Sequence, residues 1–193
     1  MKILLTLAFT AVLQQSSVVL DNARVRVYRT DAASLAGVEH APGVVVWIDE
    51  KAGDQHPRAV WRGDAADRTG LAPGSVVVVQ PKKTSGKAAA PSTGSKPGDA
   101  PFVGMSFTPL FENAQASVLS ARMEVGAREG FHTHASDTLV VHLSGGEIED
   151  TANGKTVVNR WKRGDVEFEA LGSSHSARNV GRAVDVILVA LKP

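Results

Sequence analysis

The sequence predicts an all-β protein, a sandwich or barrel, whose first half is shorter than its second. Two observations support this fold class. Little helical periodicity follows residue 20, whereas short valine-rich runs recur along the chain. Glycine-containing turns separate these runs in the second half, and short β-branched runs divided by turn signals are typical of sandwiches and barrels. The chain has 193 residues, enough for one ordinary domain or two small ones.

The expected strands fall into two groups. Three apolar runs belong to the first half, at 25–28, 44–48 and 76–79. Four more belong to the second half, at 139–143, 156–158, 166–168 and 184–189.

The N-terminal segment 1–17 combines a short basic start, an apolar run over 3–13 and a polar end. This pattern predicts a secretory signal peptide, and therefore export to the periplasm or the extracellular space. The alternative is that the apolar run forms a first buried strand. No run in the chain reaches the length of a membrane-spanning helix, so no transmembrane span is expected.

Residues 81–100 are almost all small, polar, basic or proline. Such a segment buries too little apolar surface to offset the entropy of ordering it, so it predicts a flexible linker. It divides the chain into a first half over 18–80 and a second half over 101–193.

The two halves also resemble each other. Asn22 matches Asn113, each half carries a tryptophan shortly before a Gly-Asp pair, and valine-rich strands end just before Lys82 and Lys192. We therefore expect a duplication in which the first half has lost residues. Its expected role is to cover a sheet edge of the second half or to supply a dimer surface.

Composition excludes several classes of function. The absence of cysteine excludes disulfides, thiol nucleophiles and cysteine-based zinc sites. The formal net charge is only +1, and the basic excess falls in the expected linker. This distribution gives no support for a nucleic-acid partner, because nucleic-acid binding needs basic charge on a folded face.

The histidines of the second half are the candidate metal ligands. His132 and His134 are two residues apart, so on a strand they point to the same face. Two imidazoles on one face can reach one metal at about 2.0–2.1 Å. A third histidine, His175, lies in a glycine-containing stretch further along.

The two histidine stretches resemble the two motifs of the cupin family, G(x)5HxH(x)3–4E(x)6G and G(x)5PxG(x)2H(x)3N. The matching residues are Gly126, His132, His134 and Gly145 in the first motif, and Gly164, Gly172, His175 and Asn179 in the second. The resemblance covers residues from about 107 to 193. It implies a cupin-2-like barrel of the jelly-roll type, a bicupin-like chain with a degenerate first half, and metal ligation by His132, His134 and His175.

Two positions depart from the motifs. Ala170 replaces the proline of the second motif and should change only the stiffness of a turn. Thr138 replaces the glutamate of the first motif, which leaves three neutral histidines and favours an anionic ligand. Asp137 is adjacent but faces the other way on a regular strand, unless a bulge redirects it. We therefore expect no carboxylate among the metal ligands. His142 is expected to be a hydrogen-bonded core residue.

The ligand pattern is similar to that of three-histidine cupins such as thiol dioxygenases and a diketone dioxygenase. That resemblance implies a divalent transition metal, with Fe2+ favoured and Zn2+, Ni2+, Cu2+ or Mn2+ as alternatives. It also implies an iron(II)-dependent oxygenase acting on a small anionic or chelating substrate. The alternatives are a non-catalytic small-ligand or metal-binding module and a structural barrel without metal. The sequence assigns no catalytic residue. The expected partners are a small molecule and, as in many cupins, a second copy of the chain.

Overall fold

The structure is a computed structural model that describes residues 16–37, 41–49, 57–63, 73–82, 92–93 and 102–192. The predicted signal peptide lies outside these residues except at its last two positions. Most of the expected linker also lies outside them, but Ser92–Thr93 form a short strand, β6, that pairs with β8. Within the described part of the chain, no helix has the length and apolar character needed to cross a membrane.

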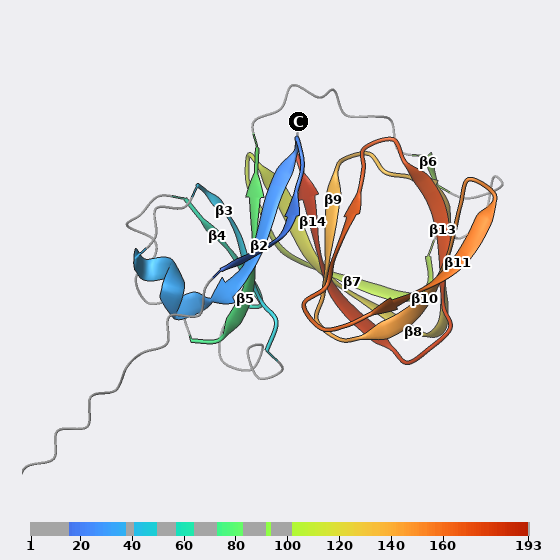
Figure 1. Cartoon of the computed structure of the whole chain (residues 1–193). Helices are drawn as coiled ribbons and strands as arrows, with labels where there is room; N and C mark the ends of the chain where they lie inside the picture. Colours follow the sequence, from blue (N-terminus) through green and yellow to red (C-terminus); the bar gives the residue numbers. More distant parts are fainter. Residues whose placement is uncertain are drawn as a thin grey trace, which may run out of the picture.

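The second half is one antiparallel sheet that curls into a barrel (Figure 1). The strand order is β11-β10-β13-β8-β14-β9-β12, and β6 and β7 also pair with β8. Its strands are β7 (Phe102–Glu112), β8 (Ala116–Thr133), β9 (Thr138–His142), β10 (Gly146–Ala152), β11 (Lys155–Trp161), β12 (Val166–Glu169), β13 (Ser174–Asn179) and β14 (Val184–Leu191). The all-β barrel predicted from the sequence is confirmed, although β7, β8, β10 and β13 were not among the expected strands.

The first half forms a separate five-stranded antiparallel sheet. Its elements are β1 (Ser17–Asp21), β2 (Val25–Asp31), the 3-10 helix η1 (Ala32–Gly37), β3 (Gly43–Trp47), β4 (Ala59–Arg62) and β5 (Ser75–Pro81), in the order β1-β2-β5-β3-β4. Every residue of β3 is buried. Burial on both faces explains why the valine runs of this half are continuous and do not alternate with polar residues.

The two sheets pack face to face through one hydrophobic core (Figure 1). Val27, Val46 and Val79 from the first sheet meet Val118 and Ile187 from the second. The first half therefore covers a face of the second sheet, and not a sheet edge as the sequence led us to expect. Because apolar side chains of both sheets are buried in this one core, the two sheets depend on each other for stability.

Equivalent contacts recur in the two halves. The side-chain oxygen of Asn22 accepts hydrogen bonds from the amides of Arg24 and Val25, and that of Asn113 accepts from Gln115 and Ala116. The strand orders β1-β2-β5-β3 and β7-β8-β14-β9 also correspond. These matches favour the predicted duplication.

The strand registers match as well. In the first sheet Val44 pairs with Val79 and Trp47 with Val76, and in the second sheet Leu139 pairs with Val189 and His142 with Val186. The faces that meet in the shared core are thus built from corresponding positions. The opposite faces differ, because the first half fills its own with a small core under η1, closed by Ala32 and Leu35 among others. In the second half the corresponding face borders a cavity.

Shortening a side chain at the centre of the shared core should destabilise the whole molecule. We expect Ile187→Ala to lower the free energy of unfolding by about 2–5 kcal/mol, because Ile187 is fully buried. Val157→Ala is the control: Val157 is 52% exposed, so its loss should change stability by less than about 0.5 kcal/mol. Urea unfolding, followed by tryptophan fluorescence and circular dichroism, should show one transition. Two separate transitions would contradict a shared core.

Candidate metal centre

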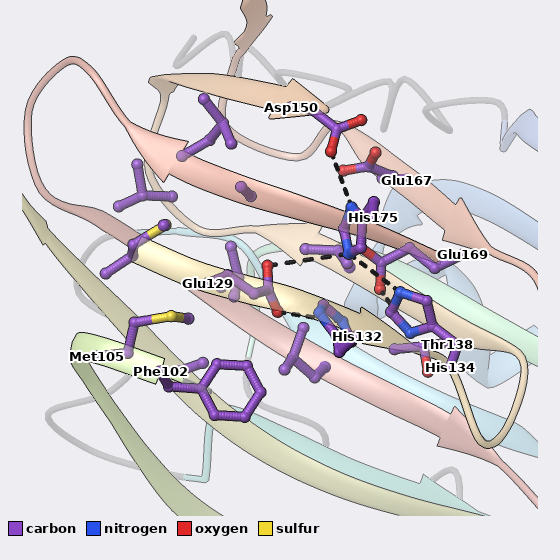
Figure 2. Close-up of a pocket in the computed structure, with 18 of the residues that line it drawn as sticks. Phe102, Met105, Glu129, His132, His134, Thr138, Asp150, Glu167, Glu169 and His175 are labelled. Carbon is purple, nitrogen blue, oxygen red and sulfur yellow. Dashed lines mark hydrogen bonds and ion pairs between the residues drawn. The ribbon is translucent and has the colours of Figure 1, made fainter. Parts of the chain in front are cut away.

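Strand pairing brings the three predicted histidines together. His132 lies on β8 and pairs directly with His175 on β13. His134 follows the end of β8, where its amide donates to the carbonyl of Ser173 and its carbonyl accepts from Gly172. The three rings therefore converge inside the barrel from two neighbouring segments (Figure 2). The convergence expected from the motif spacing is present in the structure.

The distances between the rings suit a shared metal ion. The Nε2 atoms of His134 and His175 lie 3.1 Å apart, and one ligand atom from each histidine falls within 4.8 Å of the other two. Ring centroids are 4.7–5.0 Å apart. Two imidazole nitrogens bound to one ion at about 2.0–2.1 Å lie about 3 Å apart, so the nitrogens need little movement to bind it.

The other nitrogen of each ring faces an oxygen atom. Nδ1 of His175 lies 2.9 Å from Oδ1 of Asp150, and Nδ1 of His132 lies 2.9 Å from the carbonyl oxygen of Gly130. Nδ1 of His134 lies 3.5 Å from Oε2 of Glu169. An acceptor at Nδ1 keeps the proton on that atom and leaves the Nε2 lone pair directed at the centre, which is the arrangement that metal-binding histidines need.

Burial keeps His134 neutral. Loss of solvent, followed by the nearness of His132 and His175, lowers the pKa of His134 to about 4. A neutral imidazole is the form that binds a metal.

Four carboxyl groups surround the histidines, where the sequence led us to expect none. They are Glu129, Asp150, Glu167 and Glu169, and all four line the same cavity (Figure 2). Oε1 of Glu129 lies 3.5 Å from Nε2 of His132, and its Oε2 lies 4.0 Å from Nε2 of His175. Glu129 thus faces the metal-directed nitrogens of two histidines.

A β-bulge explains how Glu129 reaches this face. On β8, His132 and Glu129 are three residues apart, whereas their partners His175 and Ala177 on β13 are two apart. The extra residue reverses the alternation of side chains, so Glu129 joins His132 on the inner face. Strict alternation, read from the sequence, places it outside the barrel.

Glu167 and Glu169 reach the cavity from β12. They are two residues apart, so they share a face, and Glu169 pairs directly with Thr138 on β9. The position where the motif has its glutamate is therefore flanked by a glutamate from the neighbouring strand. Asp137 is no substitute: it is buried away from the histidines, where Arg24 and the amide of Leu171 donate to it.

Burial also makes Glu129, Glu167 and Glu169 reluctant to ionise in the metal-free protein. Loss of solvent is the largest cause for each of these three: it raises the pKa of Glu129, raises that of Glu169 well above its ordinary value, and raises that of Glu167 to about 7. Asp150 and Glu129 add to the shift of Glu167, and His175 opposes it. A divalent ion would favour the ionised forms.

The rest of the cavity is mainly apolar. It has a volume of about 280 Å³. Phe102, Met105, Leu119, Met123 and Val186 are among the residues that line it. His142 lies in this wall, stacked on Trp161 with ring centroids 4.6 Å apart. It is buried as expected, but the expected hydrogen bond is missing: within the described part of the chain, neither of its ring nitrogens has a partner.

The remaining motif residues have structural roles. Gly126, Gly164 and Gly172 all have positive φ, a conformation that favours glycine. The side-chain amide of Asn179 donates to the carbonyls of Met123, Glu124 and Arg182, which ties β13 to β8 beside the site. Both motifs thus meet at one place in a curled antiparallel sheet. The second half has the cupin fold.

Comparisons with solved structures give matches of the same kind, each over just under half of this chain. A cupin domain from Bordetella pertussis Tohama I is 22% identical over 47% of this chain and 95% of its own, with a TM-score of 0.44. An RmlC-like cupin from Shewanella frigidimarina is 19% identical over 47% of this chain and 78% of its own, with a TM-score of 0.40. A cupin superfamily protein from Desulfitobacterium hafniense is 15% identical over 46% and 78%, also at 0.40. No family model and no curated protein matches.

The buried acids give the metal-free protein a pH-dependent stability. With a pKa of about 7 in the folded state against an ordinary 4.5, Glu167 keeps its proton where the unfolded chain has lost it. Its contribution is present at lower pH and is lost as the pH rises through about 7. The lowered pKa values of His134 and His142 act in the opposite direction, but only below about pH 6.5.

We therefore expect the melting temperature of chelator-treated protein to fall between pH 6.5 and 8. Glu167→Gln should reduce this slope because it removes one of the titrating groups. Glu147→Gln, an exposed carboxyl that pairs with Arg160, should leave it unchanged. A melting temperature that rises over this interval, or the same slope in Glu167→Gln, would contradict the assignment.

Proposed function

We propose that this protein binds a divalent transition metal through Nε2 of His132, His134 and His175. One observation carries the proposal: the three rings converge, and each has an oxygen beside its Nδ1. Histidines that only form hydrogen bonds in a core need not converge in this way. Histidines that bind a metal direct one ring nitrogen at the ion and donate from the other to an oxygen. Imidazole donors suit iron, zinc, copper and nickel alike, so the donor set agrees with the metals implied by the cupin resemblance.

Glu129 is proposed as the carboxylate ligand that the motif lacks at Thr138. Its two oxygens face Nε2 of His132 and Nε2 of His175. A single ionised carboxylate would halve the charge of a divalent ion and offset part of the cost of burying it. Asp150 would hold His175 in place from behind. Glu169 lies beside Nδ1 of His134, and its Oε1 is 3.7 Å from Nε2 of His175.

The finer proposal is an iron(II)-dependent oxygenase that acts on a small chelating substrate. When bound, a ferrous ion supplies redox chemistry with dioxygen and polarises the substrate. The apolar wall of the cavity excludes water. Glu167, with a pKa near 7, can hold or accept a substrate proton at its carboxyl oxygen. Four carboxyl groups in the cavity favour an uncharged chelating substrate over an anionic one.

The first test is metal content. His132→Ala or His175→Ala should abolish stoichiometric metal, measured by elemental analysis of tag-free protein, while circular dichroism shows a folded barrel. Asp150→Asn should weaken metal binding by about 10–100-fold, because it removes the partner of His175 Nδ1. Unchanged metal content in His175→Ala would contradict the three-histidine site.

The second test concerns the carboxylate ligand. Glu129→Gln should weaken Zn2+ or Mn2+ binding by about tenfold or more, because the buried ion loses its nearest negative charge. Thr138→Glu should restore binding in the Glu129→Gln background, since Thr138 lies beside the histidines (Figure 2). Glu147→Gln is the control for a surface carboxyl. Wild-type affinity in Glu129→Gln would show that this group is not a ligand.

The oxygenase proposal is tested by oxygen consumption of the Fe2+-loaded protein with thiols, diketones and phenolic acids. Turnover that disappears in His175→Ala would support it. Binding of these compounds without oxygen uptake would favour the alternative, a non-catalytic small-ligand module, which the mainly apolar cavity also suits. Export and homodimer formation remain predictions from the sequence and the cupin resemblance.

A further inference from the structure

The buried His142 is a polar group of the barrel that the metal centre does not use. Its side chain lines the cavity and is only 2% exposed, yet Nδ1 and Nε2 both lack a hydrogen-bond partner among the residues that the structure describes. Its backbone is fully bonded: the amide donates to the carbonyl of Asp165, and the carbonyl accepts from Gly164. Buried polar side chains are rarely left unpaired, because a lost partner costs free energy.

Packing alone does not explain a histidine at this position. The matching position in the first half is Trp47, since Trp47 pairs with Val76 as His142 pairs with Val186. Trp47 is buried in the small core of that half. An aromatic residue therefore fits this place in the strand, and in the second half the histidine adds two polar atoms beside a cavity that can receive a ligand.

The imidazole is held in a fixed plane and is uncharged. It stacks on Trp161 at an interplanar angle of 17°. Burial lowers the pKa of His142 to about 4, although Asp165 opposes the shift. At neutral pH the ring therefore offers one N–H donor and one acceptor nitrogen.

We propose that His142 anchors the polar end of a small, uncharged, mainly apolar ligand that carries a hydroxyl group, a phenol or an alcohol. The apolar lining, with Phe102, Met105 and Leu119, accepts the body of such a molecule. The hydroxyl pairs with the ring of His142, and the mainly apolar lining makes burial of an anion costly. This inference rests on the proposed small-ligand role of the cavity and does not depend on the metal.

Three probes of similar shape separate these elements: 4-ethylphenol, 4-ethyltoluene without the hydroxyl, and anionic 4-ethylbenzoate. Calorimetry is performed on chelator-treated protein, so absence of metal binding does not affect the result. We expect 4-ethylphenol to bind about tenfold more tightly than 4-ethyltoluene and 4-ethylbenzoate to bind more weakly than either. Binding of 4-ethylbenzoate as tight as that of 4-ethylphenol would overturn the preference for an uncharged ligand.

His142→Phe is the decisive variant. It should abolish the preference for 4-ethylphenol over 4-ethyltoluene, and it should not lower the melting temperature because it removes two unpaired polar atoms. Leu119→Val, which changes the wall but not the anchor, should weaken both probes equally and keep their ratio. The same preference in His142→Phe as in the wild type would overturn the proposal and leave His142 facing ordered water only.

A second measurement uses the wild-type protein. The ring nitrogen-15 chemical shifts of His142, identified by their loss in His142→Phe or, if that variant does not fold, in His142→Gln, should move on saturation with 4-ethylphenol and stay in place with 4-ethyltoluene. Saturation with 4-ethylphenol without a change in these shifts would contradict the assigned hydrogen bond.

Discussion

The antiparallel pairing of β8 with β13 is the constraint on which the site depends. It places His175 directly opposite His132, and the bulge in the same pair turns Glu129 onto the inner face. Asn179 ties the two strands together through the backbone carbonyls of Met123 and Glu124. The positions of the ligands are therefore fixed by backbone hydrogen bonds, which are stronger determinants of geometry than the flexible side chains themselves.

The two halves put the same sheet pattern to different uses. Corresponding faces meet in the shared core, where Val27 and Val118 occupy equivalent register positions. The opposite face is filled under η1 in the first half and is hollow in the second. The first half packs against the sheet that carries β9 and β14, and so supports the wall of the cavity from outside. The residues at one matching position differ in the same way: Trp47 lies in the small core of the first half, and His142 lines the cavity of the second.

Much of the fold and part of the site could be predicted from the sequence. Apolar runs and glycine turns indicate an all-β chain because strand propensity is local. The spacing of His132, His134 and His175 predicts that they converge, because the motif reflects their positions along the strands. The acids could not be placed. Glu129 depends on a bulge that reverses its face, and Glu169 comes beside Thr138 only through pairing between β9 and β12. Two glutamates at alternate positions in a short strand, Glu167 and Glu169, were the available signal for an acidic inner face.

The most direct measurement of the central claim is an anomalous difference map from a crystal of the Zn2+-loaded protein. The account predicts one strong peak within about 2.0–2.1 Å of Nε2 of His132, His134 and His175, with a carboxylate oxygen of Glu129 in the same coordination sphere. A peak bound elsewhere, or full metal loading with the three rings outside bonding distance of the ion, would contradict it.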